Sequence, residues 1–239
     1  MLQQLLCFFV CVCVGWPAVL YGQSEEFYRS QVSYGVNLNT QGGLIGGISG
    51  RYARQIKDKQ YHHFSLELVE IKHPKEERLS SLLTGEFFVP GKQNYFFVWR
   101  PQYGREMIFF QKARERGVQV SGVAAAGPTF GMVIPYVIVY EQNRLERRVQ
   151  YDPDIHSFEF IRGSGTPFEA LSDMRFRLGG SLKLSALLEY SGTKSQVLGV
   201  EAGLMLDGFN QTVQMMPLAQ NRSFFSSIFV NIFYGFNNY

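Results

Sequence analysis

The sequence predicts an all-β protein built as an eight-stranded antiparallel barrel. Three observations support this fold class. One long segment alternates strictly between apolar and polar residues, which is the period-two pattern of a strand with two different faces. Seven further segments repeat the pattern, and turn-forming residues separate them. No repeat, low-complexity segment or composition shift divides the chain into a second domain.

The clearest strand runs from Met174 to Tyr190. Every even position in it is apolar or glycine, and the odd positions are mostly polar or small. A helix would scatter Arg175 and Lys183 around its circumference, and the pair Gly179-Gly180 would cost it about 1 kcal/mol per glycine. At about 3.3 Å per residue the segment extends over roughly 55 Å. A strand of that length is well suited to a transmembrane barrel.

The other predicted strands occupy residues 32–39, 44–53, 64–68, 94–100, 118–135, 198–207 and 228–236. Tight turns are expected at 39–43 and 191–194, where Gly, Asn, Ser and Thr gather. An even number of strands closes a small antiparallel barrel without free edges.

The connections between the predicted strands differ in length. Residues 55–61, 104–116 and 191–194 form the shorter set, and residues 72–92, 136–173 and 208–221 the longer one. With the N-terminus in the periplasm, the longer set falls outside the cell, as outer-membrane barrels require.

Residues 1–22 are interpreted as a secretory signal peptide, which leaves residues 23–239 as the barrel domain. The apolar run over residues 5–14 is shorter than the roughly 20 residues of a membrane-spanning helix. The absence of Lys and Arg before this run keeps an uncleaved anchor as the alternative. All three cysteines lie within residues 1–22, so cysteine chemistry is excluded for the mature chain.

Alternation alone does not decide between a membrane barrel and a soluble, lipocalin-like barrel, whose apolar face points inward. In this sequence, the polar rows combine Gly and Ser with charges of both signs, as expected for a filled lumen. The apolar rows carry aromatic residues at the strand ends, which predict girdles at the two membrane interfaces. These residues are Tyr52, Phe64, Trp99, Tyr190, Tyr234 and Phe236. The pattern therefore favours a transmembrane barrel.

The signal, the strand pattern and the terminal strand FVNIFYGFNNY together resemble small outer-membrane β-barrel proteins of the Bacteroidota type. Segments 72–76 (KHPKE) and 151–153 (YDP) are similar to uncharacterised members of that group. The resemblance implies a barrel fold and location in the cell outer membrane, without implying an activity. Tyr239 departs from it, because Phe is more usual as the last residue.

Six charged residues are predicted to face the lumen: Arg51, Glu67, Arg100, Lys183, Glu189 and Glu201. Buried charges of both signs must pair. Because eight strands leave room for side chains rather than a channel, we expect a salt-bridged structural plug. Lys183 should pair with Glu201, Glu67 or both. A proton or ion path is the alternative.

Other combinations of residues suggest chemistry less strongly. His63 and Ser65 share a strand face, as a base and nucleophile of a lipid-modifying enzyme would. Asp152, Asp154 and His156 contain metal-ligand types, although an Asp-Pro turn explains them more simply. We therefore predict no catalytic residue, no metal and no cofactor.

The predicted function is that of a non-enzymatic outer-membrane barrel, structural or accessory to an envelope or secretion assembly. The expected partners are outer-membrane lipid and other envelope proteins. No nucleic acid is expected, since a net charge of +3 is too small to argue for it. Residues 136–173 are the predicted partner surface, since aromatic and arginine side chains anchor interfaces. The candidates there are Arg147, Arg148, Tyr151, Phe158 and Phe160. A lipid-modifying enzyme and a narrow porin-like pore remain alternatives.

Overall fold

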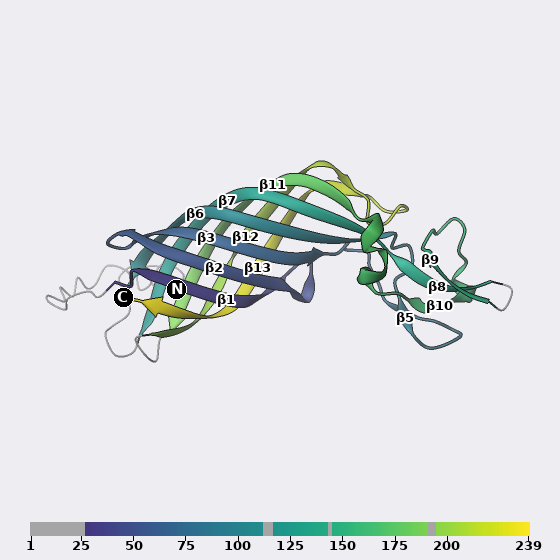
Figure 1. Ribbon diagram of the computed structural model, residues 1–239, viewed down its shortest axis with the longest axis horizontal. Helices are drawn as coiled ribbons and strands as arrows, with labels where there is room; N and C mark the ends of the chain where they lie inside the picture. The colour runs from purple at the N-terminus through teal and green to yellow at the C-terminus, as the bar shows by residue number, and fades with distance from the viewer. Residues whose placement is uncertain (1–26, 112–116, 143–144, 191–194) are drawn as a thin grey trace, which may run out of the picture.

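A computed structural model describes residues 27–111, 117–142, 145–190 and 195–239, apart from the side chains of residues 43–45. The predicted signal peptide, residues 1–22, and the turn at 191–194 lie outside the described residues. Eight long strands form the body of the molecule (Figure 1). They are β1 (Ser30–Asn39), β2 (Gly43–Lys57), β3 (Gln60–Ile71), β6 (Asn94–Phe110), β7 (Val118–Pro135), β11 (Arg175–Tyr190), β12 (Gln196–Val213) and β13 (Arg222–Asn238).

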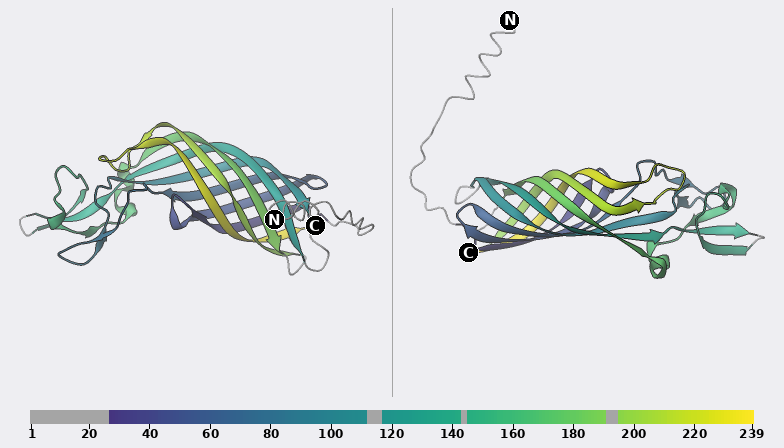
Figure 2. Two further views of the ribbon diagram at one scale, coloured as in Figure 1. Left: turned by 180° about the vertical axis from the view of Figure 1, so that it is seen from behind. Right: turned by 90° about the horizontal axis from the view of Figure 1, so that it is seen from above.

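These strands close into one antiparallel barrel in the order β1-β13-β12-β11-β7-β6-β3-β2. Strand β1 closes the ring, because Ser30 is paired with Asn238 of β13 on one side and with Arg54 of β2 on the other. The predicted eight-stranded antiparallel barrel is thereby confirmed. Strand β1 begins and β13 ends at the same rim, which we call the terminal rim, and the opposite end is the capped rim (Figures 1 and 2).

Strand β6 is longer than the alternation suggested. It continues to Phe110, so the expected connection at 104–116 is wrong over its first residues. Inward-facing Ile108 packs with Tyr28 and Tyr61 at the terminal rim, while outward-facing Met107 is also apolar. Because both faces are apolar there, the pattern that identifies a strand from sequence disappears. The expected loop at 208–221 likewise shortens to 214–221, between β12 and β13.

Residues 136–173, predicted as one long loop, fold instead into a small sheet with the strand order β10-β8-β9. Its strands are β8 (Val137–Gln142), β9 (Leu145–Gln150) and β10 (Ile161–Ser164), accompanied by the 3₁₀ helices η1 (Phe158–Phe160) and η2 (Pro167–Asp173). The loop 72–93 adds the short pair β4 (Leu79–Ser80) and β5 (Phe87–Phe88). These segments together are called the cap. Its core consists of Phe88, Tyr136, Ile138, Tyr151 and Ile161.

The outward rows of the barrel are apolar, and its inward rows carry the charged residues together with apolar clusters. On β11, the outward-facing Leu184 is 61% exposed, whereas Lys183 beside it is 1% exposed. The same alternation appears in the burial pattern of β12 and β13. A soluble barrel has the reverse arrangement. Within the described ranges, no helix is long and apolar enough to cross a membrane.

Candidate functional site

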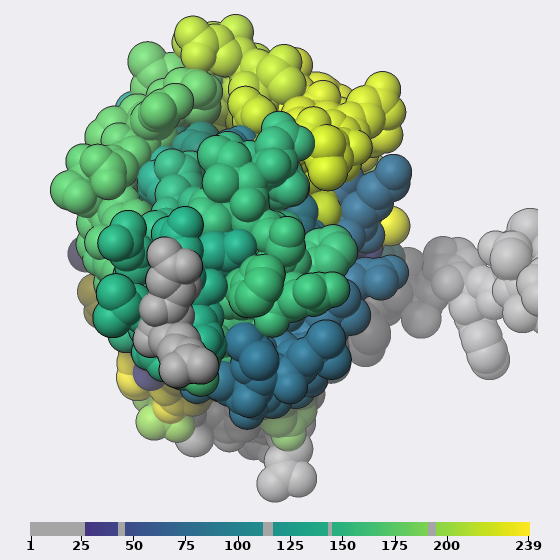
Figure 3. Space-filling model, turned by 90° about the vertical axis from the view of Figure 1, so that its right-hand side faces the viewer, coloured from purple at the N-terminus to yellow at the C-terminus, as the bar shows by residue number. Residues whose placement is uncertain are grey.

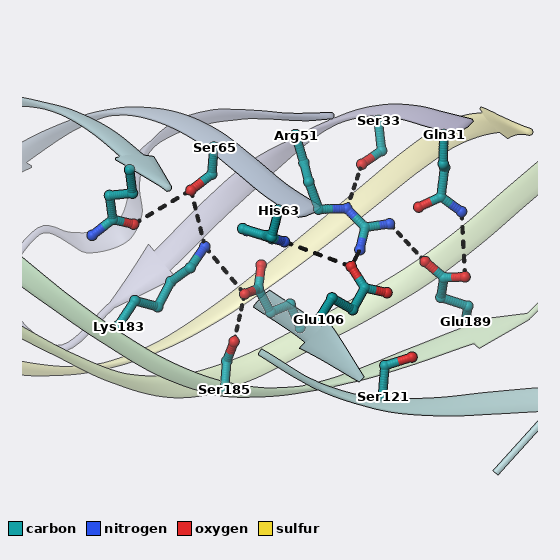
Figure 4. A network of polar contacts seen from close by, with 12 residues as sticks. Gln31, Ser33, Arg51, His63, Ser65, Glu106, Ser121, Lys183, Ser185 and Glu189 are labelled. Atoms are coloured by element: carbon teal, nitrogen blue, oxygen red, sulfur yellow. Dashed lines mark hydrogen bonds and ion pairs between the residues drawn. The ribbon is translucent and has the colours of Figure 1, made fainter. Parts of the chain in front are cut away.

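The lumen holds most of the charged residues predicted as site residues, and it brings them together in clusters. In the first cluster, Arg51 of β2 lies between the carboxylates of Glu106 on β6 and Glu189 on the opposite strand β11 (Figure 4). Its Nη1 donates to Glu106 Oε2 at 2.9 Å and its Nη2 to Glu189 Oε1 at 2.6 Å. Its Nε donates to Ser33 Oγ at 3.1 Å. All three nitrogens of the guanidinium group therefore have partners, as a buried arginine requires.

The second cluster is centred on Lys183 of β11. Its Nζ lies 3.2 Å from Glu201 Oε1 and 3.3 Å from Glu67 Oε1, which are both of the partners expected from the sequence. Ser185 donates to Glu201 Oε1 at 2.6 Å and thereby supports the carboxylate from the other side. Phe229 completes the surroundings, with its ring centroid 5.9 Å from Nζ.

The third cluster is a bidentate pair between Arg100 of β6 and Asp207 of β12. Nε donates to Oδ1 at 2.9 Å and Nη2 to Oδ2 at 2.6 Å. The Nη1 atom of Arg100 also lies 3.5 Å from Glu67 Oε2. Glu67 thus connects the Arg100 and Lys183 clusters into one network.

Two members of these clusters, Glu106 and Asp207, were absent from the residues predicted from the sequence. The alternation contained the signal needed to find them. Steps of two from Arg100 along β6 reach Glu106, and steps of two from Glu201 along β12 reach Asp207. Glu106 was missed because the strand was ended too early.

Apolar layers fill the lumen on either side of the charges. Near the capped rim, eight side chains pack together: Ile71, Phe96, Val98, Val133, Phe209, Val213, Met215 and Phe225. At the terminal rim, Tyr28, Ala53, Tyr61 and Ile108 pack together. Leu187, the apolar exception on the polar face of β11, joins a further inward cluster and is 0% exposed. The charged network therefore lies inside a filled barrel.

His63 and Ser65 do not form a nucleophile and base pair. His63 is 0% exposed inside the lumen, and its Nδ1 lies 3.6 Å from Glu106 Oε2. Ser65 instead contacts Gln102 and Lys183. Across the described residues, no hydrogen bond joins His63 to Ser65, and neither side chain faces the outside of the barrel.

Asp152, Asp154 and His156 form a turn stabilised by its own side chains. The Asp154 N–H donates to Asp152 Oδ1 at 3.0 Å, and His156 Nδ1 lies 3.1 Å from the Asp152 carbonyl oxygen. In the part of the chain that the structure describes, no group of three His, Cys, Asp or Glu residues is placed to hold a metal.

The cap carries four of the five predicted partner-surface residues on its surface. Arg147 and Arg148 are exposed, as are Phe158 (60%) and Phe160 (47%). Tyr151 is a correction, because it is 1% exposed and packs edge-on against Tyr136 in the cap core. In Figure 3 the capped rim faces the viewer. The cap covers it, with residues 136–173 in green and the loop 72–93 in blue.

A polar cavity of about 450 Å³, which no pattern in the sequence predicted, lies between the barrel mouth and the cap. It is lined by Gln93, Asn94, Val133, Pro135, Gln150, Asp173, Arg175, Arg177 and Gln214. Most of these residues stand at the start of β6 and β11 and at the end of β7. The cavity is therefore a vestibule above the apolar layer, separated by that layer from the charged network.

Comparisons with known proteins add little to this geometry. No protein-family model matches the chain. No curated protein matches it either. Among solved structures, it is similar to the crystal structure of Neisserial surface protein A (NspA), with 9% identity and a TM-score of 0.43, over 87% of this chain and 94% of that chain. A similarity at this level carries no argument about function, and the Bacteroidota type stays a prediction.

Proposed function

We propose that this chain is an outer-membrane β-barrel that does not conduct, and that its cap binds another envelope protein. One observation supports the membrane location above all others: the outward rows of the barrel are apolar while its interior is charged. A belt of exposed leucine, isoleucine, valine and aromatic side chains around a whole barrel is unfavourable in water. The hydrocarbon of a bilayer is the environment that matches it.

Aromatic side chains near both rims support the same placement. Tyr34 and Tyr234 pack together near the terminal rim, with ring centroids 6.1 Å apart. Trp99 and Phe130 do so toward the capped rim, at 5.4 Å. Such belts occupy the two interfaces of a membrane protein. With short turns in the periplasm, the cap lies outside the cell.

The filled lumen supports a structural barrel rather than a pore. An open channel needs a continuous wet path, and the buried side chains of this barrel form charged clusters between apolar layers. Eight-stranded barrels generally leave space for side chains alone. The function is then expected to reside at the surface, in the cap.

The cap supports a protein partner because it exposes large apolar side chains beside arginines. Phe168 is 78% exposed and Phe158 is 60% exposed, and Arg147 is also exposed. Aromatic and arginine residues are enriched at protein interfaces. An accessory role in an envelope or secretion assembly is the specific form of this proposal.

A pull-down from detergent-solubilised outer membrane tests the proposal. The wild type should retain a reproducible envelope partner that the double variant Phe158→Ser, Phe160→Ser loses. Leu218→Ser is a matched control, because Leu218 is 76% exposed on the β12–β13 loop at the same rim but outside residues 136–173. If the wild type and the double variant retain the partner equally, Phe158 and Phe160 do not form the binding surface. Steady conductance in planar bilayers would contradict the closed lumen.

A further inference from the structure

Three basic residues form a continuous row on the outside of the barrel. Arg54 of β2 is paired in register with His62 of β3, and His62 is paired with Arg105 of β6. Arg54 and Arg105 are exposed and His62 is half-buried, whereas one adjacent residue in each strand points inward and is 0% exposed. These inward neighbours are Ala53, His63 and Glu106. The row therefore lies on the outer surface. Its three strands, β2, β3 and β6, are neighbours in the barrel (Figure 1).

The two arginines of this row have no acidic partner among the residues that the structure describes. The nearby acidic residues of β3 and β6, Glu67 and Glu106, point into the lumen and pair there. Basic residues directly opposite each other across a sheet are destabilising unless something neutral or negative separates them. An outside surface that is otherwise apolar makes the cost greater.

The position of the row indicates what neutralises it. The adjacent outward row, one step toward the middle of the barrel, consists of Tyr52, Phe64 and Tyr103, whose rings pack together. The Phe64 and Tyr103 ring centroids are 5.0 Å apart, and His62 Nδ1 lies 2.8 Å from the Tyr103 hydroxyl. Aromatic belts of this kind mark a membrane interface. The basic row is on the rim side of the belt, at the level of lipid headgroups.

We propose that Arg54, His62 and Arg105 bind the phosphate group of a phospholipid in the leaflet at the terminal rim. The proposal rests on the membrane location given above. Paired positions on neighbouring strands have Cβ atoms about 4.5–5.5 Å apart, so the two arginines flank His62 at roughly 10 Å from each other. Their side chains are long enough to converge on one phosphate, which guanidinium groups bind in bidentate fashion. The acyl chains then lie over Phe64 and Leu66, which are 44% and 46% exposed.

Native mass spectrometry of the full chain folded in detergent tests the site. The wild type should retain phosphatidylglycerol, and Arg54→Gln, Arg105→Gln should lower its occupancy by about 10-fold or more. The control Arg78→Gln, Arg222→Gln removes two exposed arginines elsewhere and should behave as the wild type. Diacylglycerol, which has the same chains without the phosphate, should not be retained.

Two further arms separate the possible explanations. Inorganic phosphate at the same concentration as the lipid should leave the phosphatidylglycerol adduct in place. Displacement of phosphatidylglycerol by inorganic phosphate would overturn the assignment to a lipid phosphate. Equal retention by the double variant, or retention of diacylglycerol, would overturn the site while leaving the membrane location intact. Each variant is checked for folding by its faster gel migration before heating. Recovery of the wild type as a water-soluble protein would instead overturn the membrane location, and the lipid site with it.

Discussion

Lys183→Met, with its partner change Glu201→Gln, tests whether the charged network holds the barrel together. Lys183 is 1% exposed, and its Nζ lies between two carboxylates at 3.2 and 3.3 Å. The two partners are not equivalent. Glu67 also lies 3.5 Å from Arg100, whereas Glu201 has the Ser185 hydroxyl as its other close contact. Removing the lysine therefore leaves Glu201 as a buried carboxylate without a close cation.

The expected magnitudes follow from this difference. Breaking a buried pair by removing one partner costs about 3–5 kcal/mol, so Lys183→Met should lower the free energy of unfolding by that amount. Glu201→Gln leaves Lys183 with Glu67 and should cost less, about 1–3 kcal/mol. In the double variant, no carboxylate at position 201 is stranded. The double variant should therefore lose roughly 2–3 kcal/mol less free energy of unfolding than the sum of the losses in the two single variants.

Urea unfolding in lipid vesicles, followed by tryptophan fluorescence and gel mobility, provides the four free energies of this cycle. Ser227→Ala is a useful control because Ser227 is another buried lumen residue that carries no charge. It should shift the unfolding free energy by about 1 kcal/mol or less. Strictly additive effects of Lys183→Met and Glu201→Gln would show that the two side chains do not interact.

Three other predictions concern the lipid face, the inner packing and the cap. Leu184→Arg should lower the free energy of unfolding in vesicles by about 2–4 kcal/mol, because the 61% exposed Leu184 faces the bilayer; an unchanged value would show that this row does not meet lipid. Leu187→Ala on the same strand should cost about 2–5 kcal/mol through a cavity in the inner cluster, and bilayer thickness should not alter that loss. The Thr166 backbone N–H and the Arg148 side chain hold the pKa of Glu169 below its usual range. Its contribution to the capping box of η2 should therefore be complete above about pH 4.3 and be lost as the pH falls through the lowered pKa. The Thr166 amide resonance should titrate in that acid range in the wild type and not in Glu169→Gln, and an identical titration in both would assign it to another group.

The barrel could be predicted from sequence because its two faces differ chemically. On β11, one row is apolar and the other carries Ser181, Lys183 and Ser185, so the period of two is visible without any structure. The same parity identified Lys183 and its two carboxylate partners. The bounds of β11, Arg175–Tyr190, agree with the predicted segment to within one residue. The predicted segments 64–68 and 228–236 were shorter than β3 and β13, which extend further at both ends.

Other parts of the structure could not be predicted, because the two faces of their strands do not differ chemically. Glu106 was missed because Ile108 and Met107 make both faces of β6 apolar near the terminal rim. The cap sheet was missed because its strands are short, and most residues of β9 are exposed on both faces, which leaves no alternation to detect. Tyr151 was predicted to be a surface residue because the β8–β9 hairpin, which places it opposite Tyr136, leaves no strand pattern in the sequence.

We propose that the apolar rows of the barrel face lipid while its polar rows face a closed interior. The most direct test places a single nitroxide-labelled cysteine at successive positions 181–188 of β11, with Cys7, Cys11 and Cys13 replaced by serine. Collision rates with oxygen dissolved in the bilayer should be high at even positions such as Leu182 and Leu184. They should be low at odd positions such as Ser181 and Ser185, for oxygen and for a water-soluble quencher alike. Access of the water-soluble quencher to the even positions would show instead that the apolar rows face water.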